Sequence, residues 1–152
     1  MKGKRGKKGK YVIFAKRGLI NDDIWNPILK NYETSLICKI RKRLKKINGL
    51  TEKFNSNSRY FGYWIGDDKD RVYIYVQKKN IRIDLYISPM FKKDILREDK
   101  DFTVSYVNNY QGRARWLTGW HVPHDTKKMS FVIKLLKKAL KGTYNQEKAS
   151  GQ

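Results

Sequence analysis

The chain has 152 residues, of which 35 are Lys or Arg and 14 are Asp or Glu, so its formal net charge is +21. This length fits one domain. Cys38 is the only cysteine, which excludes an intramolecular disulfide and a cysteine-based zinc site and predicts a reducing, cytoplasmic location. No apolar run is long enough to predict a membrane-spanning helix. The excess of bases predicts a polyanionic partner, most commonly nucleic acid.

The first ten residues predict a basic arm. They contain no apolar residue after Met1 and have Gly at every third position from Gly3 to Gly9. Such a segment has nothing to bury, so residues 1–10 are expected to be disordered when free and to follow a phosphate backbone when bound. The phosphate-contacting residues expected in this arm are Lys2, Lys4, Arg5, Lys7, Lys8 and Lys10.

Residues 11–16 predict a strand, and residues 33–48 predict an amphipathic helix. Leu36, Ile40 and Leu44 fall on one stripe at helical spacing. Residues 22–32 predict a short helical turn that cannot continue through Pro27. We expect the bases of the longer helix to occupy its outer face and to contact phosphate: Lys39, Arg41, Lys42, Arg43, Lys45 and Lys46.

From residue 59 to residue 122 the hydrophobic period changes to two, which is typical of strands. The expected strands, in an antiparallel meander, are residues 59–65, 71–78, 81–88, 102–107 and 113–121. A helix with a basic outer face follows at residues 126–141. This order predicts a single α+β domain over residues 11–142, with an antiparallel sheet of about five to six strands and two main helices on one face. Residues 143–152 are expected to be a flexible tail.

Alternation along the strands predicts an aromatic sheet face. If Val72, Ile74 and Val76 face the helices, Tyr73 and Tyr75 point the other way. Aromatic rings interleaved with Arg are typical of surfaces on which single-stranded bases stack. The alternative is that these rings form cross-strand pairs or a second core layer. The residues expected to contact bases are Tyr73, Tyr75, Arg82, Tyr86, Arg113, Arg115 and Trp116.

An acidic turn before one strand leaves an enzymatic alternative open. Nucleases of the restriction-endonuclease type place an acid near a strand with an acid-x-Lys element to hold Mg²⁺. Asp70, Asp84 and Lys79 are the residues that this alternative would use, although Gln77 stands where the second acid is usual. The chain has no phosphate-binding glycine loop and no nucleophile elbow.

The two histidines, His121 and His124, stand close in sequence to Asp125, and all three are residue types that bind metals. Their segment includes Pro123 and has no regular geometry, so we predict no metal site. No cofactor is predicted either.

The stretch from Leu36 to Leu140 resembles a family of small α/β domains of unknown function, some described as predicted transport proteins. The resemblance is carried by the basic helix, the aromatic strand at residues 60–64, the segment at residues 83–87 and Gly119 to Val122. It implies a small domain found with DNA-related enzymes. The family has no established active site to carry over.

We therefore expect a non-enzymatic nucleic-acid-binding protein, and the nuclease is the alternative. The partner is RNA or DNA, within a ribosome or larger nucleoprotein complex or beside DNA enzymes. A membrane is not expected, because the apolar stripe of residues 33–48 is narrow and has no Trp or Phe anchor.

Overall fold

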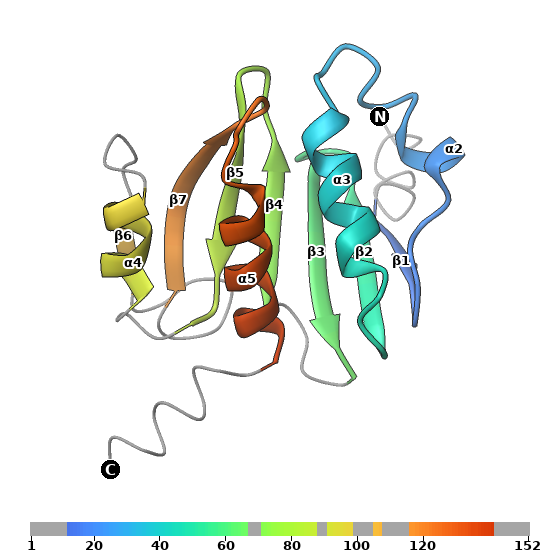
Figure 1. The fold of residues 1–152 in the computed structure, drawn as a ribbon. Helices are drawn as coiled ribbons and strands as arrows, with labels where there is room; N and C mark the ends of the chain where they lie inside the picture. Colours follow the sequence, from blue (N-terminus) through green and yellow to red (C-terminus); the bar gives the residue numbers. More distant parts are fainter. Residues whose placement is uncertain (1–11, 67–70, 88–90, 99–104, 108–115, 142–152) are drawn as a thin grey trace.

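The computed structural model describes residues 12–66, 71–87, 91–98, 105–107 and 116–141. Of residues 105–107 it describes the backbone only. The predicted α+β class is confirmed: an antiparallel sheet carries helices on one face (Figure 1). The elements in chain order are β1 (Val12–Ala15), α2 (Asp22–Trp25), α3 (Ser35–Leu44), β2 (Leu50–Asn55), β3 (Tyr60–Ile65), β4 (Val72–Val76), β5 (Asn80–Leu85), α4 (Phe91–Glu98), β6 (Ser105–Val107), β7 (Trp116–Pro123) and α5 (Met129–Leu140). The basic arm, the tail and Asp70 lie outside the described residues.

The sheet has seven strands in the order β1-β2-β3-β4-β5-β7-β6. The sequence analysis did not predict β2, because Glu52 and Lys53 interrupt its alternation of apolar and polar residues. It did not predict α4 either. The expected meander is wrong at its end. β7 pairs with β5, and the three-residue β6 pairs with the outer edge of β7. The long, half-buried β7 fills the inner position and the short β6 takes the edge, where an unpaired backbone is tolerated.

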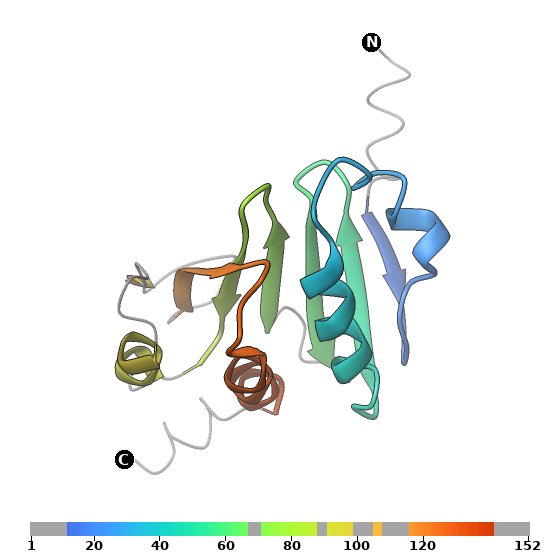
Figure 2. The same ribbon diagram turned by 45° about the horizontal axis from the view of Figure 1, so that its top comes forward.

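One face of the sheet carries the core. Helix α3 lies in front of β2 and β3, and α5 lies in front of the strands that follow, while α4 lies on the same side (Figures 1 and 2). Their apolar stripes meet inward-facing strand residues such as Phe54, Phe61 and Ile83, all fully buried. Burial of this apolar surface is the main stabilising contribution, at about 25 cal/mol per Å².

The opposite face of the sheet is aromatic. Along β3 and β4 it presents Tyr60, Trp64 and Tyr73, and the Lys53 ammonium lies 5.3–5.9 Å from the centroids of these three rings. Gly62 makes this packing fit. A Cβ at that position would stand 3.2 Å from Lys53 Cε and 3.3 Å from two atoms of the Tyr73 ring. In the part of the chain that the structure describes, no helix is long and apolar enough to cross a membrane.

Candidate nucleic-acid interface

The two long helices form a cationic surface. Helices α3 and α5 pack side by side and run in the same direction (Figure 1). The residues that begin them, including Leu36 and Met129, line one hollow. Neither helix contains an acid: their sequences are SLICKIRKRL and MSFVIKLLKKAL. The apolar stripe of each helix packs on the sheet, which leaves the Lys and Arg side chains other than Arg41 on the outer side.

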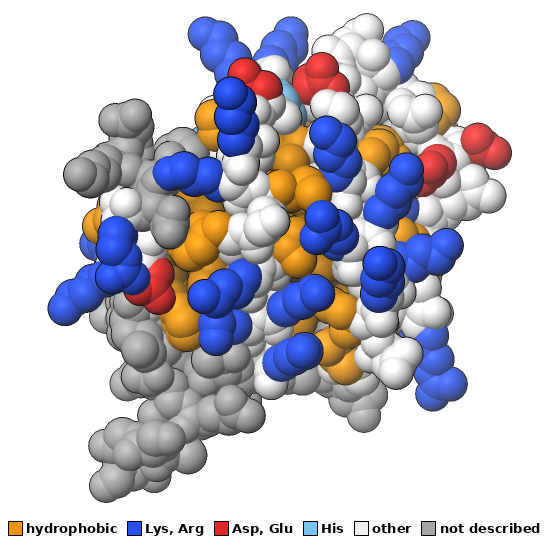
Figure 3. Space-filling view, viewed as in Figure 1, with side chains coloured by type: hydrophobic (Ala, Val, Ile, Leu, Met, Phe, Trp, Pro, Cys, Tyr) orange, Lys and Arg blue, Asp and Glu red, His pale blue; other side chains and the backbone are white. Residues whose placement is uncertain are grey.

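A groove of about 570 Å³ runs along this surface. Its described lining is Arg43, Ser130, Ile133, Lys134, Lys137, Lys138 and Lys141. Within the described residues none of these bases is within ion-pair distance of a carboxylate. Figure 3 shows Lys and Arg side chains spread over the whole helix side of the molecule, with the acids near its upper edge and one on its left flank. We call the groove and the exposed bases beside it on α3 the cationic helix face.

Most of the predicted helix residues lie on this face. Lys39, Lys42 and Arg43 are exposed on α3, and Lys45 and Lys46 are exposed directly after it. The bases of α5, expected on the outside of that helix, line the groove. Sequence periodicity was therefore sufficient to find the surface, and packing brought its two halves together.

The prediction that Arg41 contacts phosphate is wrong. Its side chain is only 4% exposed and turns into the layer between α3 and the sheet. Nε and Nη2 donate to the two carboxylate oxygens of Glu52, each at 2.8 Å, and Nη2 also donates to the Ile20 carbonyl at 2.6 Å. Nη1 donates to Asp22 at 2.5 Å. The guanidinium also lies 4.9 Å from the centroid of the Trp25 ring.

Glu52 is the centre of this buried network. Besides Arg41, its carboxylate accepts from the Tyr63 hydroxyl at 2.5 Å and from the Ile20 N–H at 2.7 Å. Burial raises the pKa of Tyr63 well above its ordinary value, and the adjacent Glu52 charge raises it further. Burial alone would lower the pKa of Arg41, but its hydrogen bonds and ion pair with Glu52 outweigh burial and raise it. The network is therefore a fixed ion pair that joins helix to sheet.

The aromatic sheet face differs from the expected base-stacking surface. Tyr73 and Trp116 stack on each other with ring centroids 5.5 Å apart and planes 7° apart, and they are 2% and 0% exposed. A base cannot reach either ring, so these two form a second core layer. Tyr75 and Tyr86 are half-buried, and the Arg82 guanidinium lies 4.0 Å from the Tyr75 centroid. Arg113 and Arg115 lie outside the described residues.

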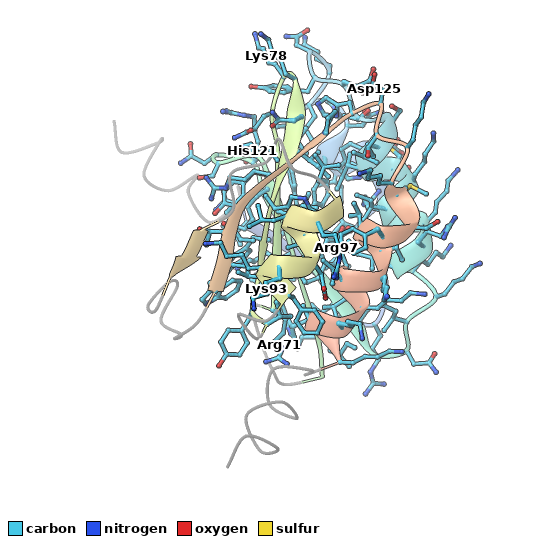
Figure 4. The ribbon with its side chains drawn as sticks, turned by 60° about the vertical axis from the view of Figure 1, so that its left-hand side comes forward. Arg71, Lys78, Lys93, Arg97, His121 and Asp125 are labelled. Atoms are coloured by element: carbon cyan, nitrogen blue, oxygen red, sulfur yellow. The ribbon has the colours of Figure 1, made fainter. Side chains whose placement is uncertain are left out.

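The structure describes two residues of the nuclease alternative, Asp84 and Lys79, and it does not bring them together. Asp84 is fully buried, and its oxygens accept from Arg82 Nη2 at 2.9 Å and from the Gly119 N–H at 3.0 Å. Lys79 precedes Asp84 by five residues along the β4–β5 hairpin, a separation of about 17 Å. Figure 4 shows Lys78, the neighbour of Lys79, at one end of β4 and Arg71 at the other. Asp70, the third residue of this alternative, lies outside the described residues.

The two imidazoles are not arranged around a metal. His124 Nε2 is 2.7 Å from the Gln77 carbonyl oxygen, which anchors the start of the α5 segment to the β4–β5 turn. His121 lies on β7, and Asp125 lies beyond the end of that strand (Figure 4). The described ranges hold no group of three metal-ligand side chains.

Comparison with known protein families, with curated proteins and with solved structures finds no significant match for this chain.

Proposed function

We propose that this protein binds nucleic acid through the cationic helix face, without catalysing a reaction on it. One observation carries the proposal: α3 and α5 contain no acid, and the bases along the groove between them have no carboxylate partner in the described residues. Lys and Arg side chains that line a groove without carboxylate partners attract the phosphates of a nucleic-acid backbone. The counterions that the nucleic acid then releases favour binding.

The chemistry of the groove supports positioning and not catalysis. Its described lining offers ammonium and guanidinium groups, one hydroxyl and one apolar side chain, and none of these is a general base or a metal ligand at neutral pH. Contacts of this kind fix a phosphate backbone in place without reading its sequence. The partner in this proposal is therefore RNA or DNA, and the basic arm at residues 1–10 is proposed to add further phosphate contacts.

The direct test is the salt dependence of binding. Affinity for a labelled duplex and a labelled single strand is measured by fluorescence anisotropy at several salt concentrations. Each phosphate contact contributes a slope of about −0.9 to a plot of log K against log salt for duplex DNA. The double variant Lys134→Gln/Lys137→Gln is expected to reduce this slope by about 1.8.

The matched control is Lys78→Gln/Lys79→Gln, which removes the same charge from exposed positions in the β4–β5 turn. It is expected to change the slope far less. Equal effects of the two double variants would show that bulk charge alone binds, which would refute the role of the groove. The absence of any binding at low salt would refute the function. Sequencing nucleic acid that remains on the purified protein distinguishes RNA from DNA.

A further inference from the structure

A second hollow, separate from the cationic helix face, lies at one end of the first three strands. It encloses about 640 Å³, within the range of small-ligand sites. Phe14 of β1, Thr51 of β2 and Trp64 of β3 form its wall on the helix-free side of the sheet. Thr51 lies opposite Trp64, and Phe14 lies opposite Lys53, two residues along β2 from Thr51. The complete described lining is Phe14, Lys16, Arg17, Gly49, Thr51, Trp64, Ile65 and Gly66.

Phe14 is the unusual residue of this pocket. It is 55% exposed, the highest value among the large hydrophobic side chains of the described residues. Its ring meets the nearly buried Trp64 ring edge to face, with centroids 6.2 Å apart. One side of Phe14 is therefore held by Trp64 and another is open to solvent. An exposed aromatic ring held in place in this way offers a flat apolar surface to a second ring.

The mouth of the pocket is built from turns with left-handed backbone. Gly49 and Gly66 have φ values of 79° and 61°, and their backbones join through the Gly66 N–H and the Gly49 carbonyl at 3.2 Å. Arg17 has a φ of 58°, a conformation that costs an L-residue free energy and that glycine adopts readily. An arginine in a position that favours glycine places a guanidinium at the mouth at the expense of backbone strain.

We propose that this pocket binds one unpaired base of a single-stranded nucleic acid together with its phosphate. The base stacks on Phe14, and Lys16 and Arg17 contact the phosphate. Aromatic rings beside a cationic path are the usual means by which proteins hold single strands. The inference rests on the proposed function and adds a preference for single strands, because a base within a duplex is not free to enter a pocket.

The chain connects this pocket to the cationic helix face. Lys45 and Lys46 follow α3 directly, and Gly49, three residues later, lines the pocket. A nucleic-acid strand lying along α3 therefore leaves that helix at the end of the sheet where the pocket lies, and it would pass round this end to reach the helix-free side.

The test compares Phe14→Ala with Ile24→Ala in the full chain. Ile24 is also an exposed hydrophobic residue, at 42%, and it does not line the pocket. The probes are a labelled oligodeoxythymidylate, the matching oligouridylate and a duplex of equal length. Phe14→Ala is expected to lower affinity for the single strands about 5- to 100-fold, as for one lost stacked base, and to leave duplex affinity unchanged. Ile24→Ala is expected to change neither affinity.

A second pair of variants tests the cation. Arg17→Gly and Arg59→Gly each remove one exposed arginine from a left-handed position, with φ of 58° and 55°, so the backbone relaxes in both. Only Arg17 lines the pocket. Arg17→Gly is expected to weaken single-strand binding by about tenfold, as for one lost charge-assisted contact, and Arg59→Gly by clearly less.

The outcomes separate this inference from the proposed function. If Phe14→Ala binds single strands as well as Ile24→Ala does, the pocket is overturned, while the effect of Lys134→Gln/Lys137→Gln still supports the helix face. If Phe14→Ala loses affinity for single strands and Lys134→Gln/Lys137→Gln does not, the result supports the pocket and refutes the role of the cationic helix face. If no probe binds the unchanged chain, both proposals fail.

Discussion

Arg41 of α3 and Glu52 of β2 form a two-point ion pair in the layer between helix and sheet, with both N–O distances 2.8 Å. Four further hydrogen bonds complete it, from Arg41 to Ile20 and Asp22 and to Glu52 from Tyr63 and Ile20. A buried charge is tolerated when its partners are satisfied in this way. The pair holds α3 in one position on the sheet and so fixes the bases on its outer face.

Glu52→Ala is expected to lower the free energy of unfolding by about 3–5 kcal/mol, because it leaves the Arg41 charge buried without its partner. The double variant Arg41→Met/Glu52→Leu is expected to cost less than Glu52→Ala alone, since no charge remains unpaired. Urea denaturation measures both values. Nucleic-acid affinity of the folded double variant is expected to be unchanged. If the double variant loses as much unfolding free energy as Arg41→Met and Glu52→Leu lose in sum when measured separately, this account is contradicted.

The buried Tyr63 hydroxyl predicts a loss of stability at high pH. Its pKa is raised in the folded protein and ordinary, near 10, in the unfolded chain. Below pH 10 both states are neutral. Above it only the unfolded chain ionises, so this residue lowers stability by about 1.4 kcal/mol per pH unit until the folded pKa is reached. Denaturation of the unchanged chain and of Tyr63→Phe across this range checks the slope, which the variant is expected to lack. Parallel curves for the two proteins would contradict it.

Gly62→Ala tests the packing beneath Lys53. The added methyl meets Lys53 Cε at 3.2 Å and the Tyr73 ring at 3.3 Å, so we expect a loss of about 1–3 kcal/mol from overpacking. Gly18→Ala is the control, because a Cβ there meets no atom within 4 Å. It is expected to add about 0.4–1 kcal/mol by restricting the unfolded chain. Thermal and chemical denaturation measure the change in stability of each variant. A Gly62→Ala variant that is more stable than the unchanged chain would show that the aromatic face is loosely packed.

Asp84→Ala separates a structural carboxylate from a catalytic one. The change removes the acceptor of Arg82 and of the Gly119 N–H, so stability is expected to fall by about 2–3 kcal/mol. Incubation of the unchanged chain with Mg²⁺ and labelled single and double strands is expected to give no cleavage. Cleavage that disappears in a folded Asp84→Asn variant would instead establish the nuclease alternative.

Local patterns were enough to predict most elements. The stripe of Leu36, Ile40 and Leu44 predicted α3, and the alternation through Val72 and Ile74 predicted β4, because burial of one face imposes a period on each element. The strand β2 was missed because Glu52 stands at an inward position. A buried acid breaks the hydrophobic pattern, and only its partner on another element makes that position stable.

The sequence by itself determined the class of fold, the absence of acids from the two long helices and the charge that favours a polyanionic partner. These properties depend on composition and on spacing along one segment. The tertiary structure alone decided that Arg41 is buried, that Tyr73 and Trp116 are covered, and that Phe14 stands beside Trp64 at the mouth of a pocket. Each of these depends on which residue of a distant segment lies opposite, and strand register and helix packing set those distances.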